Sequence, residues 1–223
     1  MLGFLFGPAG GVALTDEKIG RGDYEHAVDL FFVACAASNP WGCHDLGLTL
    51  IEHLAREQEA GLDALELACP RLPLSCNEMG RLLEQGRTVE RDVVRAAAAY
   101  RKGCDASYGK SCVRLANLIR GGVVPGGDVE VSTLSERACE LGDGDGCANA
   151  GIARRATPEE AIARFEKGCT LKSVAACDQL AEYFTTGEFV PVDDVRAVAA
   201  RAKACALGHL ASCPGAGDPP AYE

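Results

Sequence analysis

The sequence of 223 residues predicts an all-α fold, an array of short helical hairpins in which each hairpin is closed by its own local disulfide. Two observations support this prediction. The twelve cysteines form six pairs that recur about every 35 residues, and the residues after each pair repeat with helical spacing. A period of this length is typical of a solenoid, in which each supersecondary unit packs against its neighbours.

The cysteine spacing defines the repeat. The members of a pair are eight residues apart in five pairs and seven apart in one, and first cysteines follow one another at intervals of 34, 35, 35, 30 and 36 residues. A tight turn between two helices brings such cysteines together, which suits the Cα separation of about 5.5 Å in disulfides. The predicted pairs are Cys35–Cys43, Cys69–Cys76, Cys104–Cys112, Cys139–Cys147, Cys169–Cys177 and Cys205–Cys213.

A predicted helix, named helix A, begins at each second cysteine. The residues 3, 4 and 7 positions later are mostly apolar, and the residue at position 4 is Gly or Ala in every helix A. Positions 0, 3, 4 and 7 share one helical face, and a small residue there allows a neighbouring helix to approach closely. The expected caps are Gly86, Gly121 and Gly187 at the ends of A helices, and Asp92, Asp128, Thr157 and Asp193 before the following B helices.

Helix B runs from such a cap to the next first cysteine, so six B helices should alternate with five A helices. The array is expected to end on a bare B helix, because Pro and Gly dominate the chain after Cys213. Residues 15–19 are interpreted as the stub of a missing first helix A. The predicted organisation is an N-terminal segment at 1–22, a repeat solenoid at 23–213 and a flexible tail at 214–223.

Structural disulfides are favoured over metal or redox chemistry. The sequence has no Cys-x-x-Cys and no histidine pair at ligand spacing, and nothing beside a cysteine marks a reactive thiolate. Ser107 and Lys110 match the Ser-x-x-Lys motif of serine β-lactamases, but the companion Ser-Asp-Asn and Lys-Thr-Gly motifs are absent. The four histidines are scattered and expected at the surface or at helix ends. No catalytic residue, metal ligand or cofactor is therefore predicted.

Composition limits the compartment and the partners. A net charge of −10 argues against nucleic-acid binding, and no stretch approaches the roughly 18 apolar residues of a membrane span. Twelve paired cysteines require an oxidising, extracytoplasmic space, whether periplasmic, secreted or on a lipoprotein. Residues 1–14 are apolar but lack Lys and Arg, so they are a poor export signal. Either export follows another route, or the true start lies upstream.

The third repeat, residues 99–119 (AYRKGCDASYGKSCVRLANLI), resembles a Sel1-like repeat. The resemblance covers roughly residues 23–213, and the cysteines make it similar to the cysteine-rich branch that includes the Helicobacter cysteine-rich proteins. It implies a right-handed, TPR-like α/α solenoid whose concave groove binds proteins. Some cysteine-rich members have been described as penicillin-binding or weakly β-lactamase-like. The short fourth loop and the prolines at 70 and 73 depart from the family pattern.

Two functions remain open. The first is a monomeric scaffold that binds a protein or peptide through its concave face, which the A helices line according to the resemblance. The alternative is a weak β-lactamase or penicillin-binding hydrolase. For the first, positions 2 and 5 after each second cysteine point away from the core stripe. The predicted partner-binding residues at these positions are Asp45, Glu78, Arg81, Arg114, Asn117, Asn149, Gln179 and Glu182.

Overall fold

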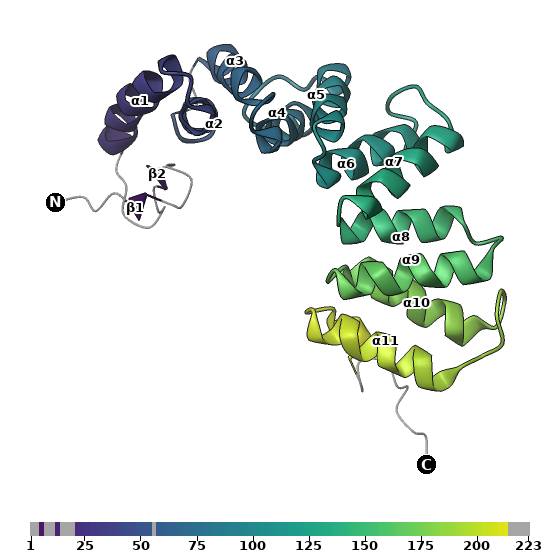
Figure 1. The fold of residues 1–223 in the computed structure, drawn as a ribbon. Coiled ribbons are helices and arrows are strands. Elements are labelled where there is room, and N and C mark those ends of the chain that lie inside the picture. Colours follow the sequence, from purple (N-terminus) through teal and green to yellow (C-terminus); the bar gives the residue numbers. More distant parts are fainter. Residues whose placement is uncertain (1–4, 7–11, 14–20, 55–56, 214–223) are drawn as a thin grey trace. The chain divides into compact units, whose positions relative to one another are not determined.

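The computed structural model describes residues 5–6, 12–13, 21–54 and 57–213, and within them eleven α-helices follow one another as antiparallel hairpins (Figure 1). The chain divides into two compact units, residues 1–111 and 112–223, and the division falls in the first turn of α6 (Gly109–Arg120). The six odd-numbered helices are the B helices and the five even-numbered ones the A helices. The predicted all-α hairpin array is confirmed.

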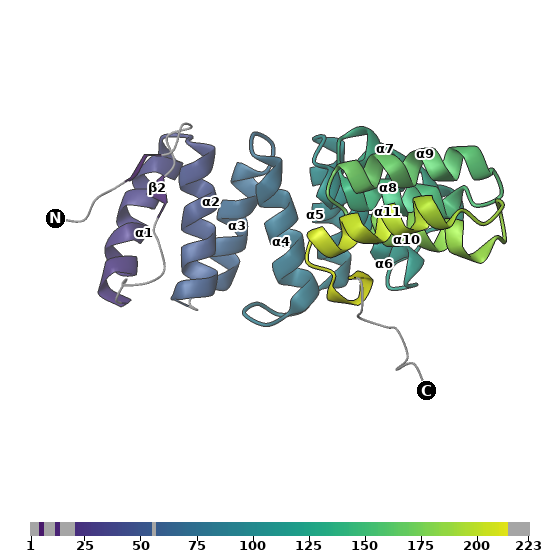
Figure 2. The ribbon, with the colours of Figure 1, turned by 90° about the horizontal axis from the view of Figure 1, so that it is seen from below.

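The first unit contains α1 (Arg21–Ala36), α2 (Pro40–Leu48), α3 (Gln58–Ala68), α4 (Pro73–Gln85) and α5 (Val93–Asp105), and α2 continues into a π-helical turn, η2 (Thr49–His53). Successive helices α1 to α4 lie side by side and alternate in direction (Figure 2). Phe31, Leu46 and Leu50 are buried together between α1 and the α2–η2 segment. Preceding this array, β1 (Leu5–Phe6) pairs antiparallel with β2 (Val12–Ala13).

The second unit contains α7 (Asp128–Glu140), α8 (Gly144–Ala153), α9 (Pro158–Thr170), α10 (Val174–Thr186) and α11 (Asp194–Ala206), followed by a short 3₁₀ turn, η3 (Leu210–Ser212). The helices α8 to α11 are stacked in chain order (Figure 1). Phe165, Tyr183 and Phe184 form the aromatic centre of its core. None of the described helices is long and apolar enough to cross a membrane.

Local disulfides join B helices to the A helices that follow them, and the last one joins α11 to Cys213, directly after η3. Five bonds have Cα–Cα distances of 4.3–4.9 Å: Cys35–Cys43, Cys69–Cys76, Cys139–Cys147, Cys169–Cys177 and Cys205–Cys213. Cys104 and Cys112 are also disulfide-bonded, and the described part of the chain has no free cysteine. The expectation of one local disulfide for each hairpin is therefore confirmed.

The turn inside each disulfide loop has a fixed backbone conformation. The third residue after the first cysteine has a positive φ in all five eight-residue loops, whether that residue is glycine or not. This left-handed conformation reverses the chain within a few residues. The residues concerned are Ser38, Ser107, Gly142, Lys172 and Gly208, with φ between 62° and 96°.

The small residue at position 4 of helix A is where the next helix B packs closest. A Cβ on Gly80 would lie 2.5 Å from Cε1 of Tyr100, and one on Gly151 would lie 2.5 Å from Cε1 of Phe165. Both rings are fully buried. The inference that this position permits close helix packing is therefore correct.

Several predicted helix boundaries were wrong by one to three residues. Each helix A begins three residues before its second cysteine. In α2, α8 and α10 a polar residue caps this start: Asn39, Asp143 and Ser173 accept hydrogen bonds from the first backbone N–H groups. Gly122, not Gly121, has the positive φ after α6. Gly127, not Asp128, is the N-cap of α7.

The other predicted caps were mostly correct. Asp92 and Asp193 cap their helices through side-chain hydrogen bonds, and Gly86 and Gly187 end α4 and α10 with positive φ. Thr157 occupies the N-cap of α9, but its hydroxyl contacts Arg154 and Glu160 rather than a backbone N–H. The proposed stub at 15–19 and the C-terminal tail at 214–223 lie outside the described residues.

A candidate binding surface along the A helices

The eight predicted partner-binding residues, named here the A-helix row, lie on the A helices and none is buried. Asp45, Glu78 and Arg81 belong to the first unit and the other five to the second. Within each unit, these side chains share the solvent-facing side of their helices, opposite the cysteine stripe. The spacing of positions 2 and 5 therefore identified polar side chains that are accessible to solvent. Their role as a binding site remains a prediction.

In the first unit, a guanidinium joins two neighbouring repeats. Arg81 donates to Glu78 on its own helix and to Glu52 on η2, both at 2.6 Å. Burial disfavours the charged form of Arg81, but the hydrogen bonds to Glu52 and Glu78 outweigh it and raise the pKa of the guanidinium. Glu78 and Arg81, both members of the row, are thus already paired with each other. Arg81 also pairs with Glu52 of the preceding repeat.

Asp45 differs from these paired residues. Its carboxylate has no hydrogen-bond or ion-pair partner among the described residues, although its backbone carbonyl accepts from the Thr49 hydroxyl at 2.7 Å. Burial raises the pKa of Asp45 to about 6. A partly desolvated carboxylate without a counter-charge is unfavourable in the isolated protein. It is also well suited to receive a cationic group from a partner.

In the second unit, arginines at the ends of A helices bridge the row. Arg120 donates to Asn117 at 3.4 Å and to Asn149 of the next helix A at 3.0 Å. Arg155 donates to Gln179 at 2.7 Å, and Gln179 in turn donates to Glu182 at 3.0 Å. Much of the row is therefore a hydrogen-bonded ladder between repeats, and only part of its bonding capacity remains for a partner.

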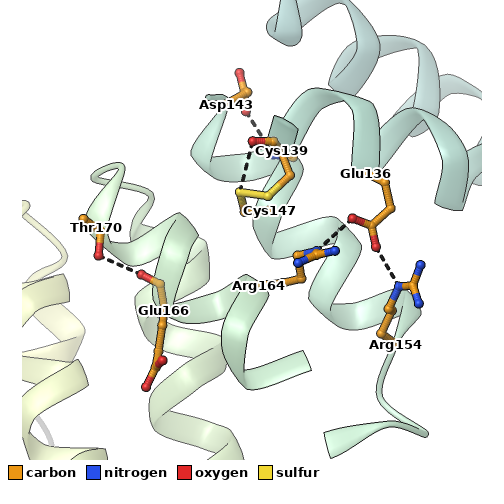
Figure 3. The surroundings of a disulfide bond; sticks show 9 residues. Glu136, Cys139, Asp143, Cys147, Arg154, Arg164, Glu166 and Thr170 are labelled. Carbon is orange, nitrogen blue, oxygen red and sulfur yellow. Dashed lines mark hydrogen bonds and ion pairs between the residues drawn. A yellow bond between two sulfur atoms is a disulfide. The ribbon is translucent and has the colours of Figure 1, made fainter. Parts of the chain in front are cut away.

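The bridging residues Glu52, Arg120 and Arg155 were not predicted from the sequence. They lie eight or nine positions after a second cysteine, about one helical turn beyond position 5. A polar residue at position 8 or 9 continues the helical face of positions 2 and 5, and this spacing could have predicted the bridging residues. A salt-bridge cluster was also missed: Glu136 accepts from Arg154 at 2.6 Å and from Arg164 at 2.8 Å, near the Cys139–Cys147 disulfide (Figure 3).

The Ser-x-x-Lys match does not form a catalytic arrangement. Ser107 is an exposed turn residue with a φ of 66°, and it occupies the same turn position as Gly142 and Gly208. Lys110 is exposed on the first turn of α6. The backbone conformation of the disulfide loop explains the position of Ser107 without a nucleophilic role.

The expectation that all histidines lie at the surface or at helix ends was wrong for His44, which is buried in α2. Its Nδ1 lies 2.9 Å from Oγ of Ser75, and burial lowers the pKa of His44. This serine–histidine pair is not a nucleophile and base, since Ser75 is inaccessible to solvent. In the second unit, another serine links two repeats: the Ser212 hydroxyl donates to a carboxylate oxygen of Asp178 at 2.7 Å.

The described residues include no group of three or more His, Cys, Asp and Glu side chains placed to hold a metal ion. An apolar groove of about 390 Å³ lies between α1, α2 and α3. Its rim includes Phe32 and Leu67, which are 62% and 70% exposed. This groove was not predicted from the sequence.

Two solved structures align over most of this chain. A Sel1 repeat protein from Oxalobacter formigenes aligns with a TM-score of 0.71 and 21% identity, covering 85% of this chain and 82% of that one. The chain has the Sel1-like repeat fold. The protective antigen c5321 of uropathogenic Escherichia coli, described as having an SLR fold, also aligns with a TM-score of 0.71, at 20% identity, covering 83% of this chain and 42% of its own. The local disulfides fit the cysteine-rich form of this fold.

Curated relatives match a shorter part of this Sel1-like chain. Cytochrome c oxidase assembly factor 7A of Xenopus laevis is 38% identical over 80 residues, and cytochrome c oxidase assembly factor 7 of Xenopus tropicalis is 36% identical over 81 residues. Each match spans 34% of this chain and 35% of the relative. No protein-family model matches the sequence.

Proposed function

We propose that this Sel1-like repeat protein is a disulfide-stabilised scaffold that binds a protein or peptide partner through the A-helix row. The observation that supports this most is Asp45, a partly desolvated carboxylate on the row with no partner among the described residues. Such a group lowers the stability of the free protein, and a cationic partner would relieve that cost. The net charge of −10 favours the approach of a basic partner in the same way.

The names of related proteins are consistent with this role. The two Xenopus relatives are named as assembly factors of cytochrome c oxidase, and an assembly factor acts on another protein. No arrangement of nucleophile, base and orienting group occurs at Ser107, so the hydrolase alternative gains no support from the geometry.

We place the protein in an oxidising compartment outside the cytoplasm. Ten of the twelve cysteines form five bonds with short loops of seven or eight residues, and the other two are also bonded. Disulfides of this density persist where thiols are not reduced. Labelling of free thiols in protein freshly isolated under acid quench tests this: extensive labelling would contradict the proposed compartment.

Binding is tested with variants on the row. Arg114→Ala and Asn117→Ala together should weaken retention of the native partner by about 1–3 kcal/mol, the range for lost hydrogen bonds to charged or buried groups. Arg114 is half-buried and Asn117 exposed, so helical content by circular dichroism should change little. The partner is first captured from the native extracytoplasmic fraction, and its affinity for each purified variant is then measured by calorimetry.

The control variant lies on a helix B. Arg101 is exposed on α5, a helix B, so Arg101→Ala should bind the partner as the wild type does. If the Arg114 and Asn117 variant binds normally while substitutions on the B helices abolish binding, the binding surface has been assigned to the wrong face.

A further inference from the structure

A small pocket opens on the A-helix row of the second unit, where α8 and α10 are neighbours. Its volume is about 30 Å³, room for a group of about two heavy atoms at its floor. Two of its lining residues, Gln179 and Glu182, are predicted partner-binding residues. The full lining is Arg155, Gln179, Glu182, Tyr183, Thr186, Glu188 and Phe189.

Arg155 has an unusual environment in this pocket. Its Nη2 donates to Oε1 of Gln179 at 2.7 Å, but no carboxylate of the described chain pairs with its guanidinium. Its Nε is buried and has no acceptor among the described residues. The adjacent Arg154, by contrast, pairs with Glu136 and Glu160, each at 2.6 Å. A buried N–H without an acceptor is unfavourable, so a ligand that offers an oxygen to this guanidinium is favoured.

The rim of the pocket has the opposite charge. Glu182 and Glu188 are exposed, and together they exceed the single positive charge of Arg155. A carboxylate ligand would meet this excess of negative charge, whereas a neutral carbonyl oxygen would not. Glutamates at the rim also offer acceptors to N–H groups. The combination of one cationic donor and two anionic acceptors fits a peptide group next to a basic side chain.

The aromatic wall fits the same ligand. The rings of Tyr183 and Phe189 are stacked, with centroids 5.1 Å apart and an interplanar angle of 9°. The Tyr183 hydroxyl donates to the backbone carbonyl of Arg155 at 3.1 Å, which fixes the wall against the floor of the pocket. Aromatic faces bind the aliphatic stem and the charged end of Lys or Arg side chains.

We propose that this pocket binds an extended peptide segment containing a Lys or Arg residue. A backbone carbonyl of the segment accepts a hydrogen bond from the Arg155 guanidinium, and the basic side chain lies beside Glu182 and Glu188, against the ring of Phe189. This assignment rests on the proposed function, because it names the chemistry of the partner segment at one point of the A-helix row.

The Nε–H group of Arg155 provides a direct test. In a ¹⁵N-labelled sample, a buried Nε–H exchanges slowly with water and should give a resolved side-chain signal, which Arg155→Lys removes and so assigns. The protein is titrated with the peptide acetyl-Gly-Ser-Lys-Ser-Gly-amide and with its counterpart that has Glu in place of Lys. The Arg155 signal should shift with the Lys peptide and respond at least threefold more weakly to the Glu peptide.

Charge-neutral variants test the rim. Glu182→Gln with Glu188→Gln should weaken binding of the Lys peptide by about threefold to tenfold, the range for two partly exposed ion pairs. Glu160→Gln is the matched control: Glu160 is an exposed glutamate of the same unit that does not line the pocket, and its loss should leave binding unchanged.

The proposal is overturned if neither peptide shifts the Arg155 signal, or if the Glu peptide binds as well as the Lys peptide. These results leave the wider function standing if Arg114→Ala with Asn117→Ala still weakens partner binding. A normal partner affinity in that variant, together with a Lys-specific shift at Arg155, would instead retain the pocket and reject the wider surface.

Discussion

Gly151→Ala should destabilise the second unit, although alanine is the better helix former. The added Cβ would lie 2.5 Å from Cε1 and 2.7 Å from Cδ1 of Phe165, well inside van der Waals contact. The ring has nowhere to move, because Phe165 is fully buried and contacts Tyr183 edge-on at 5.7 Å between centroids. The helices α8 and α9 must therefore separate, or the ring must leave its preferred rotamer.

The magnitude follows from two opposing effects. Overpacking of a well-packed core costs about 1–3 kcal/mol, and more when the contact is this short. Replacing Gly by Ala inside a helix returns about 1 kcal/mol. The net expected loss in the free energy of unfolding is about 1–2 kcal/mol. Gly127→Ala is the control for the added Cβ, since it would meet nothing within 4 Å. Gly127 is the N-cap of α7, where alanine is a poorer cap, so a loss of up to about 1 kcal/mol is expected there, and it should not depend on the residue at position 165.

Denaturant unfolding monitored by circular dichroism measures both variants and a double-mutant cycle. Phe165→Leu alone should destabilise the unit by removing buried aromatic area. In the Phe165→Leu background, Gly151→Ala should cost less than in the wild type by about 1 kcal/mol or more, because the smaller side chain can yield. Additive effects in the cycle would refute the reasoning, because they would mean that the ring is not what excludes a side chain at position 151.

Four further predictions follow from single positions or from the whole framework. Ser107→Gly should raise the free energy of unfolding by up to about 1 kcal/mol, because glycine tolerates the φ of 66°; thermal melting that does not rise would count against the turn. Ser107→Ala should behave as the wild type, and nitrocefin hydrolysis lost in this variant would contradict the scaffold function. Asp45→Asn should stabilise the protein at neutral pH by about 1 kcal/mol. The folded-state pKa of Asp45 is raised from 3.8 to about 6, so the free energy of unfolding should fall as pH rises between these two values in the wild type and less so in the variant. Intact mass should lie about 12 Da below the all-thiol value, since each of six bridges loses two hydrogens; a smaller difference in protein prepared under oxidising conditions would reveal free thiols.

The helical array could be predicted from the sequence because its signals are local. The cysteine spacing, the face at positions 0, 3, 4 and 7 and the capping aspartates all act within one hairpin, so they can be recognised without knowing how hairpins stack. The boundary errors had a local cause as well. Asn39, Asp143 and Ser173 compete with the cysteine as helix starts, and the preference of their side chains for backbone N–H groups decides the position.

The candidate site could be predicted only in part, because its electrostatics depend on contacts between repeats. The row residues were found from their face of the helix, but the partners of Arg81 and Gln179 come from neighbouring hairpins 24 to 29 residues away. The environment of Arg155 likewise depends on Gln179 and Tyr183 of the next hairpin. Helical spacing predicts which way a side chain points but not whether a counter-charge will meet it.

The repeat itself contains a correlation that explains its tolerance of variation. Position 4 of helix A faces the residue four positions before the first cysteine of the next hairpin, as Gly80 faces Tyr100 and Gly151 faces Phe165. Where position 4 is Ala116 instead, the corresponding residue is the small Ser135, which is also buried. In these three hairpins the two positions thus vary together, since a large ring faces glycine and a small side chain corresponds to alanine. In the last hairpin the corresponding residue is Arg201, which is exposed and so is not packed against Ala181 in this way. Where both positions are buried, a change at one is matched at the other, so hairpins of different sequence can stack in one array, which leaves the exposed row free to differ from repeat to repeat.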